Sequence, residues 1–232
     1  MLDIKFIYFD LDDTLLDHHA AEREALSDLV RDMEILEGIA ADRLARTYQQ
    51  INKELWERYG PGEISREQLQ RSRFEDTLEA LNLDGSRWEE VAGHYMQRYR
   101  NHWKWRPDAE KTLKKVGNAY PVGILTNGFL DIQKDKIERF SLEDYARHIV
   151  ISEEVGYLKP RPEIFAHATR LTGLEPAQIL YIGDSYRSDI LGGSGFGWKT
   201  AWYTPRKRPE NGEDADFIFE RFENLISYLE VD

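Results

Sequence analysis

The chain has 232 residues, of which 41% are hydrophobic and 12% aromatic, and its formal net charge is -12. This composition predicts one or two globular domains with a hydrophobic core and excludes a disordered or fibrous chain. The negative charge argues against polymeric nucleic acid and anionic membranes as partners, because both would repel the protein. The chain has no cysteine, which excludes thiol catalysis, disulfides and cysteine-ligated zinc.

The N-terminal segment favours a cytoplasmic protein. Its first charged residue is Asp3 and no long apolar run follows. We therefore expect neither a signal peptide nor a membrane-spanning helix.

The first predicted element is a buried strand, Phe6–Phe9, which runs directly into the acids Asp10, Asp12 and Asp13 and then Thr14. Isolated buried carboxylates cost several kcal/mol, so these acids require a solvated crevice, a bound cation or both. In open parallel sheets, ligands bind in the crevice beyond the carboxyl ends of the strands. The alternative is that the acids merely end the strand and cap the next helix.

A helical insertion follows the first strand and spans residues 18–103, because this region has helical patterning and no convincing strand. Two of its helices begin with capping-box sequences, Ser65-x-x-Gln68 and Ser86-x-x-Glu89. The four helices are expected at residues 20–37, 41–59, 65–82 and 86–101.

From Pro107 onward, strands and helices alternate. Strands are expected at residues 120–125, 148–151, 179–182, 199–203 and 216–219, and helices at residues 108–116, 131–140, 162–172, 188–192 and 223–229. This alternation predicts the α/β class, with a doubly wound parallel sheet that includes the first strand. The expected domains are an α/β core of residues 1–17 and 104–232 and an all-helical domain of residues 18–103.

Unusual polar residues follow several of these strands. Thr126 and Asn127 follow one strand, Lys159 lies after the next, and Asp184 and Asp189 follow a third. Because parallel strands end at one edge of the sheet, these side chains are expected to converge with Asp10 in a site suited to phosphoryl transfer.

The charges of this group predict a bound cation. Four acids, Asp10, Asp12, Asp184 and Asp189, face one lysine, and like charges about 4 Å apart repel by about 4 kcal/mol at an effective dielectric of 20. Mg²⁺ binds carboxylate, water and phosphate oxygens. We therefore expect a Mg²⁺ requirement.

Taken together, the motifs Asp10-x-Asp12-x-Thr14, Thr126, Lys159 and Gly183-Asp184-Ser185-x-x-x-Asp189 resemble those of the haloacid dehalogenase-like hydrolase superfamily. The resemblance covers the whole chain, because the helical insertion looks like the type I cap of that superfamily. It implies a Rossmann-like catalytic core and a phosphatase that acts on a small phosphorylated metabolite.

The resemblance also implies roles. Asp10 would be the nucleophile that forms an aspartyl-phosphate, and Asp12 would be the general acid and then the general base. Asp10, Asp184 and the Asp12 carbonyl would hold Mg²⁺. Asp189 is the fourth residue of the expected metal set, as a partner of metal-bound water or of Lys159.

Phosphate oxygens would be held by Thr126, the Asn127 backbone and Lys159. Two simpler interpretations stay open from the residues alone. Thr126 could cap a helix, and Lys159 could be a solvated loop charge.

Substrate choice is expected to depend on the helical insertion. Asn52 lies in an apolar helical stripe and Arg73 precedes Phe74, so both are candidate contacts to the leaving group; the alternative is an ordinary helical core. Pieces around these residues, with Thr126–Phe129 and residues 151–156, are similar to bacterial pyrimidine 5′-nucleotidases. That similarity implies a nucleoside 5′-monophosphate substrate.

Several other functions remain open from the residues. A phosphatase of another metabolite and a β-phosphoglucomutase-like phosphotransferase use the same acids. A dehalogenase would lack Asp12, a phosphonate hydrolase would need an imine at Lys53, and a non-catalytic binding protein would have lost part of the acid set.

Two further patterns do not indicate a functional site. Residues 192–200 resemble a P-loop but are expected to join a helix to a strand, which is the wrong order. The basic run Arg206–Arg208 is expected to be a solvated loop.

Overall fold

The computed structural model describes residues 3–205 and 214–231, and the chain forms two compact units. The first, here called the α/β unit, comprises Met1–Asp17 and Trp105–Asp232, and the second, the helical unit, comprises His18–Lys104. The second boundary lies one residue beyond the position expected from the sequence. The basic run at 206–208 lies outside the described residues.

A six-stranded sheet forms the centre of the α/β unit, with the strand order β3-β2-β1-β4-β5-β6. Every neighbouring pair of strands is parallel, which confirms the predicted α/β fold with a parallel sheet. The strands are β1 (Phe6–Phe9), β2 (Val122–Thr126), β3 (His148–Ile151), β4 (Ile179–Gly183), β5 (Lys199–Tyr203) and β6 (Phe217–Phe219).

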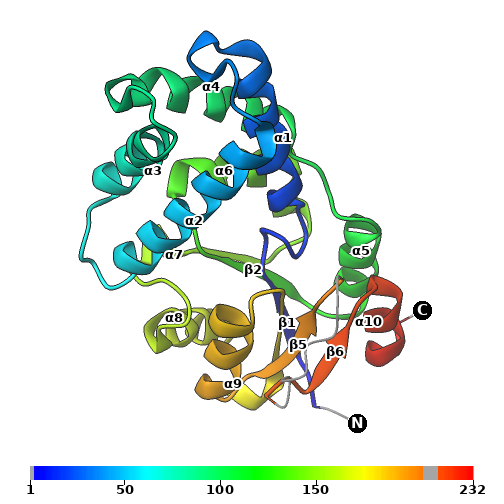
Figure 1. Cartoon of the computed structure of the whole chain (residues 1–232). Helices are drawn as coiled ribbons and strands as arrows, with labels where there is room; N and C mark the ends of the chain where they lie inside the picture. Colours follow the sequence, from blue (N-terminus) through cyan, green and yellow to red (C-terminus); the bar gives the residue numbers. More distant parts are fainter. Residues whose placement is uncertain (1–2, 206–213, 232) are drawn as a thin grey trace. The chain divides into compact units, whose positions relative to one another are not determined.

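Side chains of β1 alternate between two hydrophobic cores, one on each face of the sheet. Ile7 and Phe9 pack in the core that includes side chains from helices α5 (Ala109–Ala119) and α10 (Phe222–Leu229), whereas Phe6 and Tyr8 pack in the core that includes side chains from helix α8 (Pro162–Thr172). Figure 1 shows that α5 and α10 are neighbours on one side of the strands, and that α8 and α9 (Gly192–Phe196) lie on the other side. Burial on both faces explains the uninterrupted apolar sequence of this strand.

The helices of the α/β unit follow the expected order with two differences. A short helix after β3 was not predicted, and the helix expected at 188–192 is a π-helix, Tyr186–Leu191, that continues into α9. The α-helices of the α/β unit are α5 (Ala109–Ala119), α6 (Leu130–Arg139), α7 (Ser152–Val155), α8 (Pro162–Thr172), α9 (Gly192–Phe196) and α10 (Phe222–Leu229). Because α9 leads into β5, residues 192–200 join a helix to a strand, as expected for a segment that is not a P-loop.

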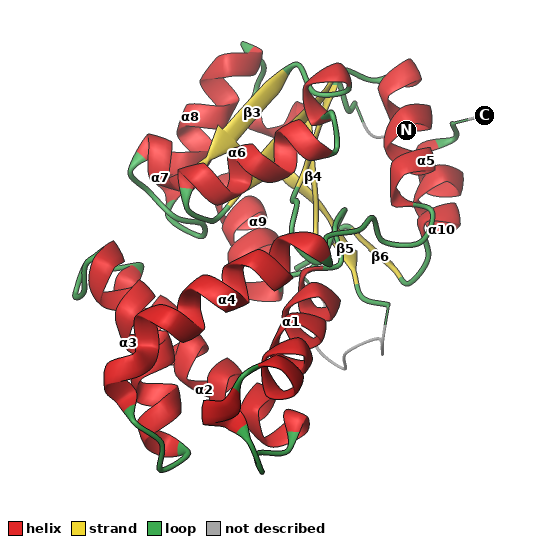
Figure 2. Ribbon diagram, turned by 90° about the horizontal axis from the view of Figure 1, so that it is seen from above, coloured by secondary structure: helices red, strands yellow, loops and turns green. Residues whose placement is uncertain are grey.

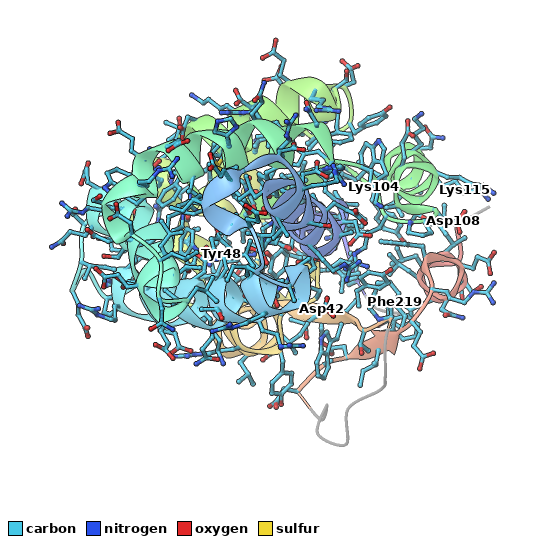
Figure 3. All side chains as sticks on the ribbon, turned by 45° about the horizontal axis from the view of Figure 1, so that its top comes forward. Asp42, Tyr48, Lys104, Asp108, Lys115 and Phe219 are labelled. Carbon is cyan, nitrogen blue, oxygen red and sulfur yellow. The ribbon has the colours of Figure 1, made fainter. Side chains whose placement is uncertain are left out.

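The helical unit is built from four helices and has no strand among its described residues (Figure 2). An aromatic cluster forms part of its core: the rings of Tyr48, Phe74 and Tyr95 lie with centroids 5.2 to 5.4 Å apart. Tyr48 is labelled in Figure 3. The helices are α1 (His18–Asp32), α2 (Ala41–Tyr59), α3 (Arg66–Ala80) and α4 (Trp88–Asn101).

Capping explains where α3 begins, but not where α4 begins. Ser65 and Gln68 form the predicted capping box of α3. The predicted capping box at Ser86 is wrong, because the Asp84 side chain accepts a hydrogen bond from the Ser86 N–H and a 3₁₀ turn, Gly85–Arg87, precedes α4. Among the described residues, no helix combines the length and the hydrophobicity needed to cross a membrane.

Candidate active site

The carboxyl edge of the sheet brings the motif residues of the α/β unit together. Asp10 directly follows β1, Thr126 ends β2 and Asp184 directly follows β4. Lys159 comes from the segment between α7 and α8, and its ammonium reaches the same place. The parallel register therefore produces the convergence expected from the sequence.

The Lys159 ammonium is the centre of the site. Its Nζ lies 2.7 Å from Oδ1 of Asp10, 2.7 Å from Oδ1 of Asp189 and 2.5 Å from the Tyr181 hydroxyl. Burial opposes its charge, but the two carboxylates outweigh this effect and hold the pKa of Lys159 above its ordinary value. The side chain is 2% exposed, so Lys159 is not a solvated loop charge.

Asp10 is almost completely buried. Oδ1 accepts a hydrogen bond from the Lys159 ammonium, and the Thr14 hydroxyl lies 3.1 Å from Oδ2. Burial raises the pKa of Asp10 to about 7, although Lys159 opposes the shift. In the protein alone, this carboxylate therefore lacks the compensation that a fully ionised buried group requires.

A cation would supply that compensation. Carboxylate oxygens of Asp10, Asp184 and Asp189 lie within 4.8 Å of one another. Burial, followed by the charges of Asp10 and Asp189, raises the pKa of Asp184 well above its ordinary value. In the described part of the chain, no lysine or arginine contacts Asp184, and these oxygen donors suit Mg²⁺.

Asp189 is already held by protein groups. Oδ1 pairs with Lys159, and Oδ2 accepts a hydrogen bond from the Ser185 N–H at 2.9 Å. Gly183 makes room for this arrangement, because a Cβ there would lie 2.4 Å from Asp189 Oδ2. Of the two roles considered for Asp189, partner of Lys159 or of metal-bound water, its contacts support the first.

The Asp12 side chain contacts two residues that the sequence analysis did not identify. The Lys136 Nζ lies 2.7 Å from both carboxylate oxygens of Asp12, and Gln133 Nε2 donates to Oδ2 at 3.1 Å. Both residues come from α6. With Lys136, the site has two lysines against the four acids rather than one, and a formal surplus of two negative charges remains.

Thr126 and Asn127 have defined partners. Gln133 Nε2 donates to the Thr126 hydroxyl at 2.7 Å, and the Asn127 amide pairs with the backbone N–H and carbonyl of Lys159 at 2.8 and 3.0 Å. Phe129 is the N-cap residue of α6, so Thr126 is not its cap. The Asn127 side chain therefore holds the backbone of Lys159 in place through two hydrogen bonds.

Asn52 and Arg73 belong to α2 and α3 of the helical unit. Oδ1 of Asn52 and Nε of Arg73 are buried and have no hydrogen-bond partner among the described residues. The Arg73 guanidinium also lies 5.1 Å from the Phe74 ring centroid. Whether Asn52 serves the core of the helical unit or contacts substrate stays a prediction. Lys53, the residue that an imine mechanism would need, is exposed on α2.

The missed residues had a weak signal in the sequence. Gln133 lies between Leu130 and Ile137 at helical spacing, so a polar side chain occupies the apolar stripe of α6. A buried polar group needs partners, which suggests a role. Tyr181 gave no such signal, because a tyrosine in a buried strand is ordinary.

The fold and this edge define an α/β protein with a buried acid and lysine centre suited to a hard cation and an anionic substrate. The sequence profile of the haloacid dehalogenase-like hydrolases matches residues 4–197. The chain belongs to this family of hydrolases.

Several relatives are similar over most of the chain. Pyrimidine 5′-nucleotidase YjjG of Escherichia coli K12 is 38% identical over 166 residues, which cover 70% of this chain and 72% of that protein. Glyceraldehyde 3-phosphate phosphatase of Pyrococcus furiosus is 32% identical, covering 99% and 95%. The magnesium-bound crystal structure of the putative HAD-hydrolase YfnB of Bacillus subtilis has a TM-score of 0.83 at 27% identity, covering 98% of this chain and 99% of that chain.

Proposed function

We propose that the protein is a Mg²⁺-dependent phosphomonoester hydrolase that acts through an aspartyl-phosphate at Asp10. The observation that carries this proposal is the buried Asp10 carboxylate, paired with Lys159 and beside Asp184 in a site with surplus negative charge. Membership in a hydrolase family whose relatives include phosphatases supports it. A magnesium-bound relative supports the choice of metal.

In the first step, an Asp10 carboxylate oxygen attacks phosphorus, and the bond from phosphorus to the leaving oxygen breaks. Asp12 gives its proton to the departing alcohol. In the second step, Asp12 takes a proton from water, whose oxygen attacks phosphorus. The bond between phosphorus and Asp10 then breaks, which releases inorganic phosphate and restores the carboxylate.

The remaining residues bind and orient the phosphate. Thr126 and the Asn127 N–H would hold phosphate oxygens, and Lys159 would stabilise the charge that spreads over them in the transition state. Asp10, Asp184 and the Asp12 carbonyl would hold Mg²⁺, with Asp189 acting on Lys159. Bound there, the metal would neutralise charge between the carboxylates and the incoming phosphate.

Hydrolysis of p-nitrophenyl phosphate with and without Mg²⁺ tests the class of reaction. We expect phosphate release that EDTA abolishes and Mg²⁺ restores, and an acid-stable radioactive phosphoenzyme after rapid quenching with labelled substrate. Asp10→Asn should abolish both. Activity that is undiminished in EDTA, or full velocity in Asp10→Asn, would contradict the proposal.

For the substrate, we propose a nucleoside 5′-monophosphate, because YjjG is 38% identical and is named a pyrimidine 5′-nucleotidase. A second candidate is a small phosphorylated sugar or triose, since the Pyrococcus phosphatase is similar over 99% of the chain. Values of kcat/KM for UMP, dTMP, dUMP, AMP, glyceraldehyde 3-phosphate and sugar phosphates separate them. Product analysis with the sugar phosphates distinguishes inorganic phosphate from the isomer that a phosphotransferase would form.

Asn52 and Arg73 are proposed as contacts of the leaving group. Asn52 Oδ1 and Arg73 Nε are buried and have no hydrogen-bond partner among the described residues, which supports this role, since such atoms usually have partners. Asn52→Ala and Arg73→Met should lower kcat/KM for the preferred ester more than for p-nitrophenyl phosphate. An equal loss for both esters would assign these residues to the packing of the helical unit instead.

A further inference from the structure

We propose that Lys136 and Gln133 are positioning residues that hold the Asp12 carboxylate for proton transfer to and from the reacting oxygen, an inference that rests on the proposed phosphatase function. They act through Asp12, and neither residue belongs to the family motifs or to the charged residues identified from the sequence. The two residues lie one helical turn apart on α6, so a single rigid element carries both.

The contacts of Lys136 are those of a positioning group. Its ammonium lies 2.7 Å from each Asp12 oxygen, and the residue is only 2% exposed. Burying an ammonium costs free energy unless it is paired, and here both carboxylate oxygens pair with it. By contrast, Lys134 on the same helix is 60% exposed, and its closest ion pair is 4.0 Å long.

Gln133 connects the proton-transfer residue to the phosphate-binding residue. Its Nε2 lies 3.1 Å from Asp12 Oδ2 and 2.7 Å from the Thr126 hydroxyl, and the residue is 1% exposed. The amide is held closely, because a Cβ at Gly128 would lie 2.9 Å from Gln133 carbons. One side chain therefore fixes the distance between the group that handles the proton and the group that orients the phosphate.

Position matters for this chemistry because a proton donor must lie within hydrogen-bond distance of the oxygen it serves. An aspartate without fixed partners samples several rotamers, and the correct geometry is then populated only part of the time. Loss of Lys136 should therefore slow only the steps that need Asp12, and loss of Gln133, which also contacts Thr126, should slow those steps most. Esters whose leaving group departs without a proton should be spared in the first step.

The test compares two esters in wild-type protein, Lys136→Met and Gln133→Leu, with Mg²⁺ present. One ester is p-nitrophenyl phosphate, whose phenolate leaves without a proton. The other is the alkyl phosphate that wild-type protein hydrolyses fastest in the panel above. Because kcat/KM reports steps up to formation of the phosphoenzyme, we expect it to fall roughly 10- to 100-fold for the alkyl ester and less than about threefold for the nitrophenyl ester.

The second step gives an independent measurement. Attack by water also needs Asp12, so kcat should fall with both esters, and rapid quenching should recover more phosphoenzyme in the variants than in wild type. Lys136→Arg should restore much of the alkyl-ester activity because it keeps a buried cation. Lys134→Met, the matched control on the exposed face of α6, should behave as wild type.

Two results would overturn the inference: an equal loss of kcat/KM for both esters, or no loss in either variant. Circular dichroism and thermal melting check that the variants fold, and each substitution tests the same contact network if the other is unstable. If wild-type protein hydrolyses neither ester, the proposed function fails. If wild-type protein is active and the variants lack ester selectivity, only this inference fails.

Discussion

At the scale of the residue, the Tyr181 hydroxyl is one of the groups that hold the Lys159 ammonium in place. It donates to the Leu125 carbonyl at 2.7 Å and accepts from the Lys159 ammonium, while its ring lies in the hydrophobic core. Tyr181→Phe keeps the ring and removes these bonds, together with a 3.3 Å contact to Asp189 Oδ1, which leaves buried partners unsatisfied at a cost of about 1–3 kcal/mol. We expect the free energy of unfolding to fall by that amount in urea titrations, and kcat to fall several-fold.

Tyr157→Phe is the matched control, because Tyr157 is 37% exposed and its ring packs against Arg161 rather than against the acids. It should change neither stability nor kcat measurably. Equal behaviour of the two variants would show that the Tyr181 hydroxyl does not support Lys159.

The sequence predicted those residues whose position is odd for their chemistry. Asp10, Asp184 and Lys159 stand at strand ends or in a following loop, where charge next to an apolar strand indicates a site. Lys136 was missed because a lysine in a charged helix normally lies in solvent, and only the three-dimensional path of α6 turns it toward Asp12. Proximity between residues 124 positions apart is a tertiary property that local pattern does not contain.

At the scale of the element, the turn between β2 and α6 sets where α6 begins. Gly128 has φ 153°, which other residues rarely adopt, and a Cβ there would collide with the Gln133 side chain. Gly128→Ala should therefore strain the turn by about 1–3 kcal/mol and displace Gln133. We expect a lower thermal midpoint and at least a tenfold loss of kcat, measured with p-nitrophenyl phosphate.

Gly117 provides the comparison, since it lies inside α5 and a Cβ there meets no atom within 4 Å. Gly117→Ala should stabilise the protein by about 0.5–1 kcal/mol, because alanine has the higher helix propensity, and leave kcat unchanged. If Gly128→Ala were as harmless as Gly117→Ala, the turn would not determine the geometry of α6.

Element types were easier to predict than element ends. The strands β3 and β5 and the helices α2 and α8 have the expected bounds, because periodicity and breakers agree there. The start of α4 was wrong because two polar side chains, Asp84 and Ser86, compete for the same turn, and the Asp84 cap prevails. In the π-helix after β4, Asp189 bonds to the Ser185 N–H and to Lys159, a long-range contact that is formed only in the folded protein.

At the scale of the whole molecule, alternating elements predicted the parallel sheet, and a long strand-free region predicted the helical unit. The strand order was not predicted, because it depends on which crossovers bury the most apolar surface rather than on any local segment. The role of the helical unit as a substrate-selecting cap stays a prediction, and Asn52 and Arg73 are the residues that test it.

The surplus negative charge of the site should make the stability of the molecule depend on Mg²⁺. A ligand that binds only the folded state at 100 times its Kd adds about 2.7 kcal/mol. For a chain of this size, that corresponds to a rise of roughly 5 to 10 °C in the thermal midpoint, measured by scanning calorimetry against sodium chloride of equal ionic strength.

Asp184→Asn removes a carboxylate that has a raised pKa and no lysine or arginine contact among the described residues. In EDTA this variant should therefore melt no lower than wild type, since it relieves repulsion with Asp10, but Mg²⁺ should no longer raise its midpoint. An equal Mg²⁺-induced rise in both proteins would place the metal elsewhere and would remove Asp184 from the proposed mechanism.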